Sequence, residues 1–340
     1  MVKAFPFSAI VGQSGMQRAL ICAAIEPDIG GVLIYGDRGT GKSTAVRGLA
    51  DLLPKIEVVE GCPYQCAPDP DSGSCEHLAD AGKAEPKTRL RAVPVVNLPL
   101  GATDDRVVGA LDIELALTQG QRRFEPGLLA QANRGFLYID EVNLLEDHLV
   151  DLLLDVAASG ENLVEREGLS LRHPARFVLV GSGNPEEGEL RPQLLDRFGL
   201  CVDVRTPEDM KERIEVIRLR DEYERSPQTF IKRFARKQGA LRKRIAQARE
   251  RVADVVVSDE LLEQIASLCL ALGTDGLRGE LTLMRTARAL AAYEGKDAAS
   301  LSHLQEVAEL ALAHRLRRDP LDESRPAVRV AKALQALELS

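Results

Sequence analysis

The chain has 340 residues, 45% hydrophobic and 28% charged, which excludes collagen-like, low-complexity and fully disordered proteins. At about 100–200 residues per domain, this length predicts two domains, or one large and one small. The net charge of −8 disfavours sequence-independent DNA binding, which needs a large positive field. No membrane span is predicted, and the opening residues are not expected to act as a secretion signal.

Short apolar runs alternate with helical patterns over the first two-thirds of the chain. We expect buried strands at 31–36, 93–98, 135–140, 176–181 and 200–204. Strands that are apolar on both faces and separated by helices form parallel sheets covered on both sides. The predicted fold class is therefore α/β, with a five-stranded parallel sheet.

After about Thr206 the predicted strands stop, and apolar residues recur at helical spacing. Helices are expected at 211–220, 227–251, 259–272, 277–293 and 301–317. Gly239 is a candidate interruption of the second helix, and the polar tail from Asp319 is expected to be loose. The predicted domains are an α/β domain at 1–205, a charged helical connector at 206–257 and a small all-α lid domain at 258–340.

The segment Lys232–Arg251 departs from the acidic average, with nine Lys or Arg and a single Glu. Its one aromatic residue, Phe234, does not make a base-stacking surface. We interpret the segment as a solvated helix or a protein-contact surface, with a nucleic-acid contact as the less favoured alternative.

A glycine-rich segment at 36–43, Gly-Asp-Arg-Gly-Thr-Gly-Lys-Ser, follows a predicted strand and opens a predicted helix. It fits the pattern G-x-x-x-x-G-K-[ST], whose glycines let backbone amides wrap phosphate groups. In such a loop Lys42 neutralises phosphate oxygens and Ser43 reaches Mg²⁺. The alternative interpretation is a glycine turn that binds no nucleotide. The expected nucleotide contacts are Gly36, Asp37, Arg38, Gly39, Thr40, Gly41, Lys42, Ser43 and Thr44.

Two carboxylates, Asp140 and Glu141, follow the apolar run 136–139. Successive strand residues point to opposite sides, so we expect the two acids to have different roles. Asp140 is expected to hold Mg²⁺ through water, and Glu141 to polarise the attacking water. The alternative for this pair alone is a capped strand end.

Three further polar residues accompany the predicted phosphate site. Asn184, beyond a buried strand, could hold the attacking water, and Arg197, before the last strand, could stabilise phosphoryl charge, often in trans. Arg278, at the start of a C-terminal helix, could report the state of the nucleotide to the lid. The bland alternatives are a turn Asn before Pro185, an ion pair between Arg197 and Asp196, and a surface arginine at 278.

Five elements thus follow one another along the chain: the glycine-rich segment, the Asp140–Glu141 pair, Asn184, Arg197 and Arg278. In this order they resemble the AAA+ ATPases and, more closely, the family of ATPase (I) subunits of magnesium chelatase. The resemblance covers nearly the whole chain, and the segments 98–112 and 181–199 set the subfamily. It implies that Asn184 is the first sensor and Arg278 the second, and that Arg197 is an arginine finger acting on a neighbouring subunit's nucleotide. It also implies that Ile10, Val11 and Gly12 contact adenine.

The resemblance further implies ATP and Mg²⁺ as cofactors and a homo-oligomeric, hexameric ring. In that family, hydrolysis drives insertion of Mg²⁺ into protoporphyrin IX for chlorophyll or bacteriochlorophyll, a ligase reaction that forms nitrogen–metal bonds. The implied partners are a D subunit with a related ATPase-like domain and a porphyrin-binding H subunit. Two inserts that reach a partner are expected, a loop and hairpin at 101–112 and a hairpin at 161–173.

Other functions remain as alternatives. One is a related AAA+ remodelling ATPase, such as a cobalt-chelatase motor or a co-chaperone ATPase. A DNA translocase is disfavoured by the acidic net charge. A nucleotide switch without turnover is disfavoured by the presence of Glu141 and Arg197.

The six cysteines fall into two groups. Those expected in the core are Cys22, Cys201 and Cys269. The others, with a histidine, lie in one Pro- and Asp-rich segment: Cys62, Cys66, Cys75 and His77. Their spacing matches no zinc or iron–sulfur template, so cysteines of an exposed loop are favoured over a metal or redox site. A reducing, cytoplasmic compartment is expected.

Overall fold

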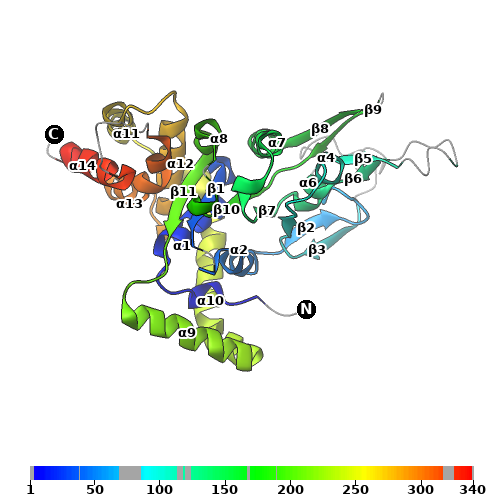
Figure 1. The fold of residues 1–340 in the computed structure, drawn as a ribbon, viewed down its shortest axis with the longest axis horizontal. Helices are drawn as coiled ribbons and strands as arrows, with labels where there is room; N and C mark the ends of the chain where they lie inside the picture. The colour runs from blue at the N-terminus through cyan, green and yellow to red at the C-terminus, as the bar shows by residue number, and fades with distance from the viewer. Residues whose placement is uncertain are drawn as a thin grey trace.

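The centre of the molecule is a five-stranded parallel sheet with strand order β11-β1-β10-β7-β4 (Figure 1). The computed structural model describes residues 4–37, 39–68, 86–112, 118, 124–166, 169–188, 190–316 and 325–338. The strands of the sheet are β1 (Gly31–Gly36), β4 (Val95–Leu98), β7 (Phe136–Ile139), β10 (Val178–Gly183) and β11 (Phe198–Val204). All five expected strands are present, and the predicted α/β class is confirmed.

Each face of the sheet packs on its own set of helices, because successive strand residues point to opposite sides. Val32 and Ile34 of β1 join a core with α1, α2 and the C-terminal helices, whereas Leu33 joins the core on the other face. This double burial explains the continuous apolar runs of the strands. The helices of the first face are α1 (Ser14–Ile25) and α2 (Lys42–Ala50), and those of the second are α4 (Asp104–Val108), α6 (Leu128–Ala132), α7 (Asp147–Ser159) and α8 (Pro192–Arg197).

The rest of the described chain is helical. Its helices are α9 (Met210–Arg225), α10 (Pro227–Arg251), α11 (Asp259–Leu272), α12 (Arg278–Glu294), α13 (Leu301–Leu312) and α14 (Pro326–Glu338). Local signals set these bounds: at α11 the Ser258 hydroxyl accepts from the Leu261 amide, and Gly273 ends the helix in the left-handed conformation. None of the helices described here combines the length and apolar character needed to cross a membrane.

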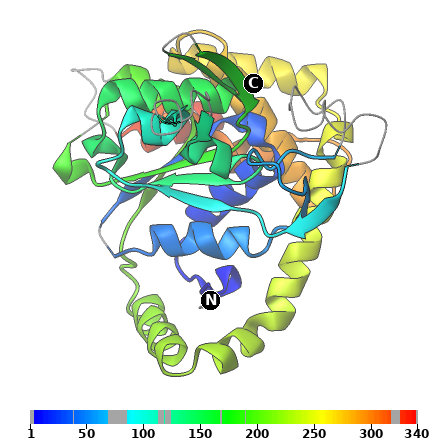
Figure 2. The ribbon, with the colours of Figure 1, turned by 90° about the vertical axis from the view of Figure 1, so that its right-hand side faces the viewer.

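Helix α10 runs unbroken through Gly239, so the predicted interruption of the helix at this glycine is wrong. Phe230 and Phe234 are buried on one side of this glycine, and Ile245 and Ala248 on the other. Anchoring at both ends outweighs the cost of about 1 kcal/mol for a glycine inside a helix. Figure 2 shows α9 and α10 extending below the sheet and meeting at their junction.

The polar tail from Asp319 was expected to be loose, but part of it forms a packed helix. Residues 326–338 form α14, which packs against α11 and α13. Val330 on this helix is 1% exposed, so an apolar contact holds the tail in place. The segment 317–324 lies outside the described residues.

Several cations of the basic segment on α10 hold other elements of the molecule. Arg242 donates to the backbone carbonyls of Asp51 and Leu52 at the end of α2. The Arg244 guanidinium donates to the carbonyl of Tyr293, 2.6 Å away, and lies over the ring of that tyrosine. Part of this basic segment therefore packs within the molecule, and a contact with another protein stays a prediction.

Three two-stranded antiparallel ribbons lie at the right of Figure 1. They are β2 (Ile56–Val59) with β3 (Thr88–Arg91), β5 (Gly109–Leu111) with β6 (Phe124–Pro126), and β8 (Glu161–Arg166) with β9 (Leu169–Pro174). The hairpin expected within 101–112 is instead α4 followed by β5, whose partner strand comes from 124–126. The ribbon of β8 and β9 spans the hairpin expected at 161–173.

His173 joins these ribbons at one buried point. Its ring is 1% exposed and stacks on Tyr64, with the ring centroids 4.7 Å apart. Nδ1 faces the Pro174 carbonyl and donates to it, so Nε2 accepts from the amide of Asn162 at 3.0 Å. The same amide donates to the carbonyl of Val108, which precedes β5.

The first cysteines of the Pro- and Asp-rich segment are not exposed, contrary to expectation. Cys62 and Cys66 are 8% and 3% exposed and pack with Val59 and Tyr64. Cys75 and His77 lie outside the described residues. Within the part of the chain that is described, no group of three or more His, Cys, Asp or Glu side chains is placed to hold a metal ion. Of the predicted core cysteines, Cys22 and Cys269 are buried and Cys201 is half-buried.

The C-terminal helices are fastened to the sheet by polar contacts. Arg288 of α12 forms a bidentate pair with Glu26, at 2.7 and 3.1 Å. After α13, the His314 Nε2 donates to the carbonyl of Phe198, the first residue of β11, at 3.0 Å. Burial lowers the pKa of His314 from its ordinary 6.5 to about 3, so the folded chain keeps this imidazole neutral.

This neutral histidine predicts a pH dependence of stability. Between pH 6.5 and about 3 the unfolded chain binds a proton at residue 314 that the folded chain does not. The contribution of His314 to the free energy of unfolding is therefore fully present above pH 6.5. It is lost as the pH falls below 6.5, by up to about 1.4 kcal/mol per pH unit. His314→Gln keeps an N–H donor but does not titrate, so its unfolding free energy is expected to fall less steeply from pH 7 to 5. Chemical denaturation of both proteins measures this, and parallel pH profiles would contradict it.

Candidate functional site

A cleft of about 670 Å³ opens at the carboxyl ends of β1, β7 and β10. Parallel strands bring their carboxyl ends to one edge of the sheet, so loops far apart in sequence meet there. The predicted site residues that line the cleft are Ile10, Val11, Gly39, Thr40, Gly41, Lys42, Ser43, Thr44, Asp140, Glu141 and Asn184. Arg38 lies outside the described residues.

The loop after β1 has the open backbone that a phosphate requires. A Cβ atom on Gly36 would lie 1.8 Å from the carbonyl oxygen of Val204, so only glycine fits where the loop leaves the sheet. Gly39 and Gly41 have φ angles of +80° and +82°, with no atom within 4 Å of where a Cβ would stand. Gly41 caps α2 with no side-chain hydrogen bond, so the first amides of that helix can bind an anion.

Lys42 lies at the inner end of this loop. Its Nζ donates to the carbonyl oxygens of Gly36, at 2.5 Å, and Gly183, at 3.2 Å. These bonds hold the ammonium between the ends of β1 and β10. Burial lowers the pKa of Lys42, and the nearby carboxylates of Asp140 and Asp37 oppose that shift.

Asp140 is held by two hydroxyl groups that the sequence did not single out. Its Oδ1 accepts from the Ser182 hydroxyl at 2.6 Å and from the Tyr138 hydroxyl at 3.1 Å. Burial raises the pKa of Tyr138, so this phenol stays a protonated donor. With the Ser43 hydroxyl in the same cleft, Asp140 supplies the oxygen ligands that suit Mg²⁺.

Glu141 and Asn184 complete the polar wall of the cleft. Glu141 has φ +55°, a left-handed conformation that costs a non-glycine residue energy and is found at functional sites. The Asn184 oxygen accepts from the amide of Glu186 at 3.1 Å, which fixes its side chain at the end of β10. Both residues line the same cleft as Lys42 and Asp140.

The other end of the cleft is apolar. Ile10 and Val11 follow a short 3₁₀ helix, Phe7–Ala9, and face residues of the α9 region. Ala9 packs with Leu219, Phe230 and Phe234, so the α9–α10 pair supports this wall. Gly12 is not part of the lining: a Cβ there would lie 3.0 Å from Glu212.

Sequence reasoning missed several residues of the cleft. They are Phe5, Gln13, Tyr138, Ser182, Thr206, Pro207, Val216, Leu219 and Arg220. Two signals could have found some of them. Thr206 and Pro207 lie just beyond a buried strand, after Arg205. Val216, Leu219 and Arg220 share one face of a helix at spacing i, i+3, i+4.

The two predicted arginines do not line the cleft. Arg197 precedes β11 and binds Asp155 at 2.7 Å and Asp151 at 3.1 Å, both on α7. The suggested Arg197–Asp196 ion pair is therefore wrong, because the carboxylate of Asp196 instead binds Arg278, at 2.8 Å, and Arg315. Arg278 thus lies beside Arg197 and not beside the phosphate loop.

Two family models match parts of this chain. The family model described as "Magnesium chelatase, subunit ChlI" matches residues 112–193, and the one described as "AAA lid domain" matches residues 262–335. A solved putative ATPase from Cytophaga hutchinsonii has a TM-score of 0.65 at 17% identity, covering 97% of this chain and 91% of that one. This likeness shows the fold alone.

Similarity at the sequence level is much higher for three other proteins. The "Magnesium-chelatase 38 kDa subunit" of Acidiphilium rubrum is 62% identical and covers 98% of this chain and 97% of its own. Its namesake in Cereibacter sphaeroides is 61% identical over 98% of both chains. A chain in a cryo-EM-based structure of the complex between subunits BchI and BchD of magnesium chelatase is 56% identical, with a TM-score of 0.54 over 98% of this chain and 99% of that one. Because relatives this similar span nearly all of its length, the chain belongs to the family of magnesium-chelatase 38 kDa (ChlI) subunits.

Proposed function

We propose that this chain is the ATP-hydrolysing motor subunit of a magnesium chelatase, in which partner subunits insert Mg²⁺ into protoporphyrin IX. One observation carries the proposal. The cleft brings together Lys42, Asp140, Glu141 and Asn184, the groups that bind and activate a nucleoside triphosphate, whereas neither predicted arginine, Arg197 or Arg278, is among the described residues that line it. That arrangement is typical of a site completed by a neighbouring subunit.

Within the cleft, each residue has a distinct proposed role. Lys42 and the amides at the start of α2 bind the phosphate groups, and the apolar wall of Ile10 and Val11 receives the base. Ser43 and Asp140 would hold a bound Mg²⁺, which would supply positive charge to neutralise the phosphate oxygens. Glu141 polarises the attacking water and Asn184 orients it.

The position of Arg197 supports action on another chain. It lies at the amino end of β11, whereas the cleft lies at the carboxyl ends of the strands. Because β11 has seven residues at about 3.3 Å each, roughly 20 Å separates the two ends, much more than one side chain spans. Arg197 therefore serves the cleft of the next subunit in a homo-oligomeric ring.

Arg278 belongs to the same edge of the proposed ring contact. It shares Asp196 with Arg315, one residue from Arg197. We therefore assign its sensor role to the neighbouring subunit's nucleotide rather than to its own.

The partners of the proposed motor follow from its relatives. The similar solved chain belongs to a complex of subunits BchI and BchD of magnesium chelatase, which supports a D-type partner for this chain. A porphyrin-binding H-type subunit and a hexameric ring complete the proposal. A cytoplasmic location is part of it, since Cys22, Cys201 and Cys269 are thiols, as in reducing compartments.

Replacing Glu141 separates binding from hydrolysis. Glu141→Gln keeps the size of the side chain and the phosphate loop, so ATP affinity is expected to change little. Turnover is expected to fall by about 100-fold or more, because the amide cannot accept a proton from water. Fluorescent-nucleotide binding and phosphate release measure the two effects, and hydrolysis within a few-fold of the unsubstituted chain would overturn the role of Glu141.

Mixing two inactive variants tests the shared site. Arg197→Ala should bind nucleotide but hydrolyse it about 10³-fold more slowly. Lys42→Ala keeps an intact finger but loses its own cleft. If the finger acts in trans, mixed rings should regain part of the ATPase activity. Absence of recovery, with subunit exchange shown by fluorescence energy transfer, would reject the proposed shared site.

The hydroxyl of Ser182 predicts a metal-specific effect. Ser182→Ala removes the shorter hydrogen bond to Asp140, and loss of such a contact to a metal ligand typically costs about 10- to 100-fold in metal affinity or activity. The Mg²⁺ concentration that half-saturates ATPase activity is expected to rise by about tenfold, with metal-free nucleotide binding unchanged. Ser159→Ala, at the end of α7, is the matched control, because among the described residues its hydroxyl bonds to backbone carbonyls and an amide. Equal Mg²⁺ requirements in both variants would count against the role of Asp140.

A further inference from the structure

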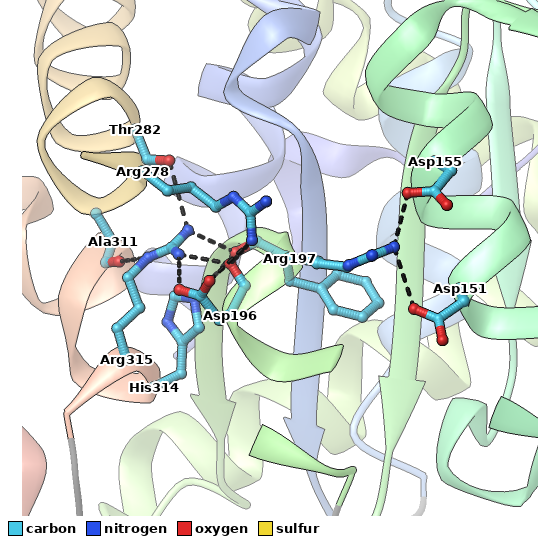
Figure 3. Close-up of polar contacts among 10 residues, drawn as sticks. Asp151, Asp155, Asp196, Arg197, Arg278, Thr282, Ala311, His314 and Arg315 are labelled. Carbon is cyan, nitrogen blue, oxygen red and sulfur yellow. Dashed lines mark hydrogen bonds and ion pairs between the residues drawn. The ribbon is translucent and has the colours of Figure 1, made fainter. Parts of the chain in front are cut away.

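Arg315, which follows α13, is almost fully buried against the residues that flank Arg197 (Figure 3). Its side chain is 2% exposed. One terminal nitrogen donates to both the carbonyl and the carboxylate of Asp196, and the other donates to the carbonyl of Phe198 at 2.8 Å. The guanidinium therefore grips the backbone on both sides of Arg197.

The remaining donors of Arg315 fix it to the C-terminal helices. Its Nε donates to the carbonyl of Ala311 at 2.9 Å, and a terminal nitrogen reaches the Thr282 hydroxyl at 3.4 Å. A planar fork with every donor directed at a partner holds its position firmly. The place of the finger is therefore set by α12 and α13, not only by its own short helix.

The side chain of Arg197 points away from Arg315. Figure 3 shows Arg315, His314 and Arg278 on one side of the finger, with Asp151 and Asp155 of α7 on the other. Asp151 and Asp155 are about half-exposed or more, so the guanidinium of Arg197 is held loosely where its backbone is held firmly. That combination suits a group that must be presented to a separate molecule.

We propose that Arg315 is a positioning residue for the arginine finger, which couples the C-terminal helices of one subunit to ATP hydrolysis in the next. The inference rests on the proposed function, because it requires Arg197 to act in trans. An error of about 1 Å in the placement of a reacting group can reduce the rate by about 100-fold. Loss of the grip is therefore expected to damage turnover in the neighbouring site and to spare nucleotide binding in the subunit's own cleft.

The test uses Arg315→Lys, which keeps the charge but cannot grip two carbonyls in a planar fork. The full-length variant is expected to bind ATP within about threefold of the unsubstituted affinity and to hydrolyse it about 10- to 100-fold more slowly. Arg288→Lys is the matched control. It alters another arginine that holds the same helices to the sheet, through Glu26 and away from the finger. Its hydrolysis is expected to stay near the unsubstituted rate, so a comparable loss there would reduce Arg315 to a general docking contact and overturn the proposal.

Mixing experiments then identify which half of the site has failed. Arg315→Lys mixed with Lys42→Ala should regain activity, because one variant supplies the cleft and the other the finger. Arg315→Lys mixed with Arg197→Ala should not, because neither has a competent finger. Suppose that the reference mixture of Arg197→Ala with Lys42→Ala regains ATPase activity. Recovery of activity in the second mixture, or no recovery in the first, then overturns the role of Arg315 and leaves the shared site standing. If that reference pair fails, the shared site itself is rejected.

A second variant covers the case in which Arg315→Lys does not fold, as judged by thermal unfolding. Asp196→Asn changes a carboxylate that is 40% exposed and removes the charge that Arg315 and Arg278 share. The same pattern is expected, with nucleotide affinity retained and recovery only with Lys42→Ala. Asp196→Asn with unsubstituted hydrolysis would contradict the proposed grip.

Discussion

The parallel pairing of β11 with β1 is the constraint on which the functional arrangement depends. Gly31 pairs with Phe198 at one end and Gly36 with Val204 at the other, so the two strands run side by side over their whole length. One end of this pair leads into the phosphate loop, and the other end follows Arg197, the proposed arginine finger. In the proposed ring, a single chain therefore holds the two parts of the catalytic machinery at opposite ends of its strands, and assembly unites them.

Much of the fold could be predicted because its signals are local. Strands buried on both faces give unbroken apolar runs, and helices such as α11 carry their own caps. The failures occurred where distant contacts override local preference. Gly239 would weaken an isolated helix, but buried residues on either side of it hold α10 straight. The short strand β5 pairs with residues 124–126, beyond the hairpin that local spacing suggested.

The candidate site was predicted as far as its residues carry a recognisable pattern. The phosphate loop, Asp140 and Glu141 lie on strand ends, and strand order alone brings them together. Ser182 and Tyr138 give no such signal, because their role depends on a hydrogen bond across two neighbouring strands. The same holds for Arg315, which is 119 residues away from Asp196 in sequence. A tertiary partner of that kind cannot be found from spacing.

The buried contact of His173 has a consequence for how the ribbons transmit force. Stacking on Tyr64 and the hydrogen bonds through Asn162 join three segments: the loop after β2, the approach to β5 and the base of β8–β9. A partner that pulls on one of these ribbons therefore also pulls on the others. Amide hydrogens in the three segments should exchange with solvent as one cooperative unit, independently of the lid helices. Mechanical work done on a partner of the proposed motor would then pass through the contact between His173, Tyr64 and Asn162.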